Sequence, residues 1–368
     1  MFEKKWTYVL LALLIAGCIA CVAGIIFILV TDYTGEERVL SRRSTHNADA
    51  PSVVTTITIS AAGDVTLGGD VRWLGYHYFM RVLEDNDGDF SYFFRNVRHI
   101  FEASDLSIAN FEGTLTYETT HLDLPFIFRA PPEFARILSY GAIDVVTVAN
   151  NHTGDFLEAG YQDTLEALDA ANIAYFGNDK NLIMDVNGIQ VGLFGFLLWT
   201  DSPEHRANIV SAIDDLKDRG AQLIIAYYHW GIMHENLAAQ YQRDLGQFTI
   251  DNGADLVLGS HPHVIQGIER YNGRFIVHSL ADFCYGGHSH PADQDSFIFQ
   301  QTFTFVDGVL QHTEDIGIIP IMMSSVREYN NFQPTIADYD DAQRIKERLR
   351  TYSDWLDSVL DDEFFRIR

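Results

Sequence analysis

The feature that most constrains the fold is a short apolar segment followed at once by polar residues, an arrangement that the chain repeats. Each apolar segment is brief and rich in aliphatic residues, which is typical of a buried β-strand. Polar residues begin where each predicted strand ends. Five such strands are predicted, at residues 53–62, 105–109, 144–149, 223–228 and 255–258.

Segments with helical periodicity separate several of these strands. Apolar residues recur every three or four positions within 157–168, 209–216 and 237–248. Alternating strands and helices predict an α/β fold with a largely buried sheet. In such folds ligands bind beyond the carboxyl ends of the strands, which is where the polar residues fall.

The pattern changes in the last third of the chain. Apolar and polar residues alternate at 296–306 and at 309–320, which predicts antiparallel strands of a second sheet. An amphipathic pattern from 338 to about 360 predicts a final helix. We therefore expect one main domain at 53–337, with a C-terminal helical segment at 338–368 packed on it.

The polar residues after the five predicted strands supply carboxylate, amide and imidazole groups. Taken alone, each has an ordinary explanation as a turn, a helix cap or a core histidine. Separate turns have no reason to bring all of these groups to one end of a sheet, whereas a metal site explains them together. Oxygen and nitrogen ligands without thiolate suit Mn, Fe or Zn. The candidate residues are Asp64, Glu112, Asn151, His152, His229, His261 and His263.

The N-terminus contains an apolar run that predicts a membrane anchor. Residues 6–30 are 25 positions without a charge, which is long enough to span a bilayer. Two lysines directly before the run favour a cytoplasmic N-terminus with the rest of the chain outside, although three arginines between 38 and 43 argue against it. We predict a single-pass anchor at 1–30, a polar tether at 31–52 and an extracytoplasmic domain at the cell membrane.

A lipid-modified cysteine is the alternative interpretation of the apolar run. Residues 15–18 look like a lipoprotein cleavage site that ends at Cys18. The run continues for twelve residues beyond Cys18, whereas a lipidated N-terminus normally passes straight into a polar tether, so the transmembrane anchor is favoured. Cys21 also lies in the anchor, which leaves Cys284 alone in the domain and allows no disulfide there.

The charge of the predicted domain excludes one class of partner. The whole net charge of −26 belongs to residues 51–368, which contain 20 basic and 46 acidic residues. An acidic surface repels the phosphate backbone of nucleic acids. Nucleic acid is therefore not an expected partner.

The segments around the candidate residues resemble those of the CapA-type capsule synthesis proteins. This family is associated with poly-gamma-glutamate capsules and is related to the calcineurin-like metallophosphatases. The resemblance covers about residues 57–365. It rests on five ordered motifs: AGDVTLG at 62–68, NFE at 110–112, DVVTVANNH at 144–152, HWG at 229–231 and GADLVLGSHPH at 253–263.

The resemblance implies a four-layer αββα metallophosphatase-like sandwich, in which helices cover two packed sheets. It also implies a site for one or two divalent transition metal ions. Asp64 would be a terminal ligand, Glu112 would take the place of the bridging carboxylate, and His152 would protonate a leaving group. The remaining metal ligands would be Asn151, His229, His261 and His263.

Five positions depart from the family pattern or add to it. The metallophosphatases have a histidine two residues after the first aspartate, where this chain has Thr66, so one metal would lack a ligand. Asp282 replaces the usual asparagine of the CapA family and either adds a carboxylate near the site or caps a turn, which we favour. His288 and His290 are candidates for the missing ligand, although a solvated loop is favoured. Arg129 is a candidate for binding an anionic substrate group, although a surface ion pair is the commoner role.

The candidate residues and the resemblance together favour a metal-dependent hydrolase or transferase that acts on an anionic cell-envelope polymer. The resemblance alone implies a place in poly-gamma-glutamate or related capsule synthesis and export. The expected partners are this polymer, the membrane and membrane-embedded capsule synthase subunits. The alternative is a non-catalytic envelope component that binds or guides the polymer beside a synthase. The acidic surface argues against direct binding of polyglutamate, unless divalent cations bridge the like charges.

Overall fold

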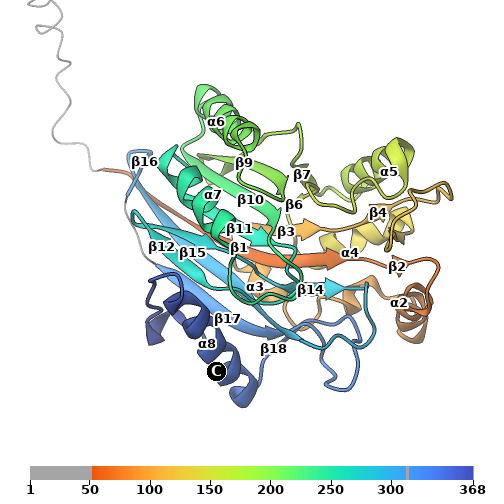
Figure 1. The fold of residues 1–368 in the computed structure, drawn as a ribbon. Coiled ribbons are helices and arrows are strands. Elements are labelled where there is room, and N and C mark those ends of the chain that lie inside the picture. Colours follow the sequence, from red (N-terminus) through yellow and green to blue (C-terminus); the bar gives the residue numbers. More distant parts are fainter. Residues whose placement is uncertain (1–51, 312–314, 368) are drawn as a thin grey trace, which may run out of the picture. The chain divides into compact units, whose positions relative to one another are not determined.

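The structure is a computed structural model that describes residues 52–311 and 315–367 (Figure 1). All the elements described here belong to one compact unit, Val53–Arg368. The predicted anchor at 1–30 and the predicted tether at 31–52, apart from its last residue, lie outside the described residues. No helix among the described residues is both long and apolar enough to cross a bilayer.

The larger sheet has nine strands, with β1 at its centre. Its order is β18-β17-β15-β1-β3-β6-β7, and in addition β14 pairs with β1 and β16 pairs with β15. Strands β1, β3, β6 and β7 run parallel, so their carboxyl ends lie at the same edge. The nine strands are β1 (Val54–Thr66), β3 (Leu106–Phe111), β6 (Val145–Thr147), β7 (Ala174–Phe176), β14 (Asp282–Tyr285), β15 (Asp295–Val306), β16 (Val309–Leu310), β17 (Ile316–Met322) and β18 (Thr335–Ile336).

The second sheet has six strands in the order β12-β13-β11-β10-β9-β8, and its central strands β9, β10, β11 and β13 are parallel. A small third sheet has the order β2-β5-β4. The strands of the second sheet are β8 (Leu182–Val186), β9 (Ile189–Leu198), β10 (Leu223–Trp230), β11 (Leu256–Ser260), β12 (Ile268–Tyr271) and β13 (Arg274–Val277). Those of the third are β2 (Gly69–Asp70), β4 (Thr114–Leu115) and β5 (Phe128–Ala130).

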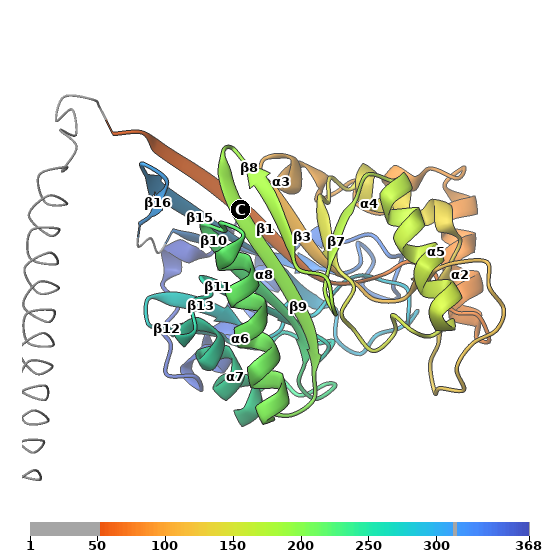
Figure 2. The same ribbon diagram turned by 90° about the horizontal axis from the view of Figure 1, so that it is seen from above.

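The two large sheets pack face to face, and helices cover their outer faces (Figures 1 and 2). Ile59 and Ile108 of the larger sheet share a core with Leu193 and Ile225 of the second. Successive side chains of a strand point to opposite faces, so Phe194 joins a separate core with α6 and α7. Helices α3, α4 and α5 cover the outer face of the larger sheet.

The helices alternate with strands through most of the chain, as the sequence predicts. The α/β class is therefore confirmed. The α-helices are α2 (Leu74–Asp85), α3 (Arg98–Glu102), α4 (Ala135–Tyr140), α5 (Leu157–Ala170), α6 (Pro203–Asp218), α7 (Gln240–Asp251) and α8 (Tyr339–Asp354).

The C-terminal helix α8 packs onto the core between the two large sheets. Asp338 caps its first turn by accepting a hydrogen bond from the backbone N–H of Asp341 (3.0 Å). Ile345 and Leu349 are fully buried in the central core. The helix is shorter than predicted because the chain turns after Asp354 and Asp357 adopts a φ of 57°, outside the right-handed helical region.

The assignment of strands to sheets differs from the prediction in two respects. Strand β15 pairs antiparallel with β1, from Val54 opposite Val306 to Ala61 opposite Phe299, so the predicted second-sheet segment at 296–306 belongs to the first sheet. Strands β10 and β11, which the strand–helix pattern assigned to the same sheet as β1, belong to the second sheet. Periodicity identifies a strand, but the sheet that it joins depends on residues far away in the sequence, which is why these assignments were wrong.

Candidate functional site

The predicted site residues converge where the carboxyl ends of strands from both large sheets meet. Asp64 lies near the end of β1, and Glu112 directly follows β3. His229 lies near the end of β10, and the segment with His261 and His263 follows β11. All five predicted strands thus deliver a carboxylate or an imidazole, since the remaining strand is followed by Asn150, Asn151 and His152.

Close backbone packing and unusual dihedral angles hold these strand ends. A side chain at Gly63 would meet the Ala281 carbonyl oxygen at 1.8 Å, and the next residue, Asp64, donates its backbone N–H to that oxygen (2.9 Å). His261 and His263 have φ values of 98° and 57°, which are costly for residues other than glycine. Such conformations persist only where the surrounding structure requires them, and they concentrate at functional sites.

Asp64, Glu112 and His263 form a group that fits a metal ion. One potential ligand atom from each residue lies within 4.8 Å of the others. The side chains of Asp64 and Glu112 are fully buried, and that of His263 is 10% exposed. A carboxylate–imidazole donor set of this kind binds divalent transition metals. The group is therefore compatible with a metal, whose type the geometry does not select.

Glu112 gives the clearest indication of a bound cation. Neither of its carboxylate oxygens has a hydrogen-bond partner among the described residues. The nearest ring nitrogens are Nε2 of His229 at 3.7 Å and Nε2 of His152 at 3.8 Å, too far for hydrogen bonds. Burial, and then the charge of Asp64, raises the pKa of Glu112 well above its ordinary value. A buried carboxylate without partners is unfavourable unless a cation neutralises it.

Asp64, by contrast, is held by hydrogen bonds. Asn110 donates its side-chain amide to Oδ1 (2.7 Å), and the backbone N–H of His261 donates to Oδ2 (3.2 Å). Asn150 in turn donates to Oδ1 of Asn110 (3.1 Å). Burial raises the pKa of Asp64 to about 6, with smaller effects of His263 and Asp282 in opposite directions. The two asparagines position the Asp64 carboxylate, a role that the sequence analysis did not identify.

His229 connects the two sheets at the site. Its Nε2 lies 2.7 Å from Oδ1 of Asn151 and 3.1 Å from Nδ1 of His261, and its Nδ1 lies 3.1 Å from the hydroxyl of Ser260. Burial, and then the neighbouring imidazoles, lowers the pKa of His229 well below its ordinary value and that of His261 to about 3. Both imidazoles are therefore neutral, the form that binds a cation.

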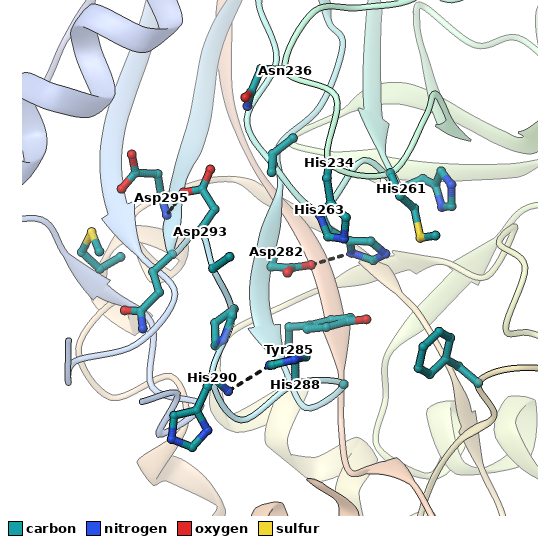
Figure 3. A pocket seen from close by; sticks show the side chains of 18 of the residues that line it. His234, Asn236, His261, His263, Asp282, Tyr285, His288, His290, Asp293 and Asp295 are labelled. Atoms are coloured by element: carbon teal, nitrogen blue, oxygen red, sulfur yellow. Dashed lines mark hydrogen bonds and ion pairs between the residues drawn. The ribbon is translucent and has the colours of Figure 1, made fainter. Parts of the chain in front are cut away.

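Asp282 is part of the site, contrary to the favoured interpretation as a turn residue. It begins β14, and its Oδ1 lies 2.8 Å from Nδ1 of His263 (Figure 3). Burial alone would lower the pKa of His263, but the carboxylates of Asp282, Glu112 and Asp64 outweigh it and raise the pKa to about 10. Without a metal the ring is therefore protonated, and a cation that binds there would displace the proton. A carboxylate on one nitrogen of a histidine fixes the ring, as in known metal sites.

His152 is paired with an aspartate that the sequence analysis did not identify. Nδ1 of His152 lies 2.8 Å from Oδ2 of Asp155, which is fully buried and accepts the backbone N–H of Phe128 (2.6 Å). The Phe128 ring packs on the imidazole, with centroids 4.2 Å apart. The signal was present in the three-residue spacing of His152 and Asp155, but turn geometry decides whether such residues meet.

A cavity of about 1150 Å³ opens beside these residues (Figure 3). Asn151, His152, His261 and His263 line it together with Asp282. The fully buried Asp64, Glu112 and His229 are not in this lining. The cavity also extends to charged side chains of the C-terminal region, namely Asp293, Asp295, Arg327, Arg344 and Arg348.

The other positions that the sequence analysis singled out differ in whether they line the cavity. Thr66 is fully buried, and its hydroxyl has no hydrogen-bond partner among the described residues, so no imidazole takes this place. His288 and His290 are exposed in the loop after β14 and line the cavity. Arg129 does not line it: its guanidinium donates to the Glu118 carbonyl oxygen and lies over the Phe156 ring. Its role in substrate binding stays a prediction.

Comparison with known proteins identifies relatives over the part of the chain that builds the site. The PGA biosynthesis protein CapA of Bacillus subtilis (strain 168) is 29% identical, over 63% of this chain and 65% of the relative. The capsule biosynthesis protein CapA of Bacillus anthracis is 26% identical, over 61% of this chain and 58% of the relative. The matched region thus spans less than two thirds of either relative.

A solved structure of a hypothetical protein from Thermus thermophilus covers 72% of this chain and 98% of its own, with 16% identity and a TM-score of 0.43. At this TM-score the likeness carries no argument about function. The model of the family described as "Bacterial capsule synthesis protein PGA_cap" matches residues 58–286, which contain all seven candidate residues of the predicted metal site. Because that match covers more than half of the chain, this protein belongs to the PGA_cap family of bacterial capsule synthesis proteins.

Proposed function

We propose that this protein is a metal-dependent hydrolase or transferase that acts on a phosphoester-like or carbonyl centre of an anionic cell-envelope polymer. The observation that carries the proposal is the buried Glu112 carboxylate, which has no partner among the described residues and lies next to Asp64 and His263. The packing of two sheets between helical layers supports a metallophosphatase-like four-layer sandwich as the finer fold assignment.

In this proposal Asp64, Glu112 and His263 hold a divalent transition metal ion, Mn, Fe or Zn. The further ligands Asn151, His229 and His261 hold the same ion or a second one. When bound, the cation supplies Lewis-acid chemistry. Asn110 and Asp282 fix the orientation of Asp64 and His263, so that the ligand atoms stay in place through a reaction cycle.

His152 is the proposed general acid. Its Nδ1 faces Asp155, which orients the ring and leaves Nε2 as the nitrogen available to a substrate. Nε2 lies 3.8 Å from Glu112, and the His152 side chain lines the cavity, so a leaving oxygen bound there would be within its reach. His152 Nε2 then donates a proton to that oxygen.

The biological setting that we propose is capsule synthesis and export, most specifically of poly-gamma-glutamate. Family membership and the names of the two CapA relatives support it. The proposed partners are the anionic polymer, the membrane and membrane-embedded synthase subunits. The cavity is large enough for several units of a polymer or for one unit and its leaving group.

Metal content and turnover test this function together. We expect the full-length chain, purified in detergent, to contain one or two equivalents of transition metal by mass spectrometry and to hydrolyse a generic phosphodiester. Removal of the metal with a chelator should abolish turnover, and added Mn²⁺ should restore it. A protein with full metal and no turnover would favour the alternative, a non-catalytic component that binds or guides the polymer. A protein that takes up no metal would contradict the proposal itself.

We also propose that the domain lies outside the cytoplasm, anchored by the apolar run at residues 6–30. Protease added to intact cells or spheroplasts should then digest the domain, because the membrane does not shield it. The measurement is loss of the full-length band on an immunoblot, with a cytoplasmic protein as the control that stays intact. Full protection of the domain, while a known surface protein is cut, would contradict this topology.

A further inference from the structure

Tyr285 presents a hydroxyl group to the cavity that the mechanism above does not use. It ends β14, lines the cavity next to His263 and is 9% exposed (Figure 3). Its ring packs between those of His263 (centroids 5.0 Å apart) and Phe128 (6.0 Å). The hydroxyl makes no hydrogen bond to any of the described residues, although a tyrosine as buried as this one usually has a partner.

The protein fixes the position of this hydroxyl from two sides. The aromatic contacts hold the ring plane, and Met323 completes the small apolar cluster around it. Gly287 passes directly over the end of the ring: a Cβ there would lie 2.5 Å from the Tyr285 oxygen. Such a close approach requires a residue without a side chain. The group is therefore held rigidly without a protein partner, as expected for a group that meets a ligand.

The surroundings determine what kind of ligand the hydroxyl suits. The hydroxyl of a tyrosine is a neutral hydrogen-bond donor at neutral pH. The Tyr285 hydroxyl therefore suits a ligand that accepts hydrogen bonds. The proposed cation would bring such a ligand to the site, because an oxyanion both binds a cation and accepts hydrogen bonds.

We propose that the Tyr285 hydroxyl binds the oxyanion of the substrate by donating a hydrogen bond to it. This inference rests on the proposed function, because a cation-dependent site is what brings an oxyanion there. The Phe128 ring contacts both Tyr285 and His152, so the proposed oxyanion donor and the proposed acid pack on one aromatic side chain. A phosphoryl oxygen and a carboxylate oxygen both accept such a hydrogen bond. Binding measurements with phosphate and with acetate distinguish these two kinds of oxyanion.

The matched variant is Tyr285→Phe, which keeps the ring and removes only the oxygen. We expect the Mn²⁺-loaded full-length variant to contain as much metal as the wild type and to bind inorganic phosphate about 10- to 100-fold more weakly in calorimetry, the usual loss for one hydrogen bond to a charged group. If acetate rather than phosphate is the ion that shows this loss, the oxyanion is a carboxylate. Tyr339→Phe, at an exposed position of α8, is the control and should bind as the wild type does.

A second variant tests whether the position of the hydroxyl matters. Gly287→Ala should displace the Tyr285 oxygen and weaken phosphate binding, but it should add little when Tyr285→Phe is already present. Equal affinity of wild type and Tyr285→Phe for both ions would overturn the inference, as would a wild type that binds neither. Tyr285-dependent binding in a protein without turnover would support the inference while contradicting the proposed hydrolase.

Discussion

We expect His152→Ala to lower the rate of phosphodiester hydrolysis by roughly 10² to 10⁴-fold, the usual contribution of a general acid. Metal content should be unchanged, because the closest polar contact of the His152 ring is to Asp155 and not to a metal-site carboxylate. The defect should shrink for a substrate whose leaving group needs no proton, such as a nitrophenol. The measurement is the catalytic rate and the metal content of the same protein preparations.

Two comparisons make this expectation specific. His261→Ala should lose metal and melt at a lower temperature, since a bound ion stabilises the native state, so its defect differs in kind from that of His152→Ala. His99→Ala, at an exposed position of α3, should behave as the wild type in all three measurements. Equal metal loss in the His152 and His261 variants would contradict the assignment of His152 as the acid.

The sequence predicts where each strand ends better than it predicts which strands pair with each other in a sheet. Apolar segments ending in polar residues located Asp64, Glu112, His229 and His261, because a strand and its following turn are local features. The sheet to which a strand belongs is decided by contacts distant in sequence. The pairing of β1 with β15 joins residues about 240 positions apart, which no local pattern encodes.

The supporting residues of the site were missed for a related reason. Asn110 lies one strand away from Asp64, and Asp155 meets His152 only through the turn that follows β6. Asp282 was interpreted as a turn residue because its partner His263 is 19 residues away in sequence. Short polar residues have many ordinary uses, so their role becomes visible only when the folded chain shows what they contact.

The buried Glu112 leads to a second large effect, this time on stability. In the metal-free protein, Glu112→Gln should raise the free energy of unfolding by about 1–3 kcal/mol near neutral pH, because it removes a buried carboxylate whose oxygens have no hydrogen-bond partner among the described residues. In the presence of saturating Mn²⁺ the wild type should become the more stable of the two proteins. Metal binding stabilises the wild type, whereas the variant has lost a ligand and binds the metal more weakly. A chemical denaturation midpoint measured with and without metal shows both effects.

The stability difference between metal-free Glu112→Gln and metal-free wild type should depend on pH, and this dependence identifies Glu112 as the cause of the difference. The pKa of Glu112 is higher in the folded protein than in the unfolded chain. Below the unfolded pKa the carboxyl is protonated in both states and costs nothing, and the cost grows as pH rises toward and through the folded pKa. The advantage of the metal-free variant should therefore be present at neutral pH and disappear near pH 4, whereas Glu118→Gln, at an exposed position, should give no difference at either pH. A metal-free wild type as stable as Glu112→Gln at neutral pH would mean that the carboxylate has a compensating partner, and the main argument for a cation at this site would fail.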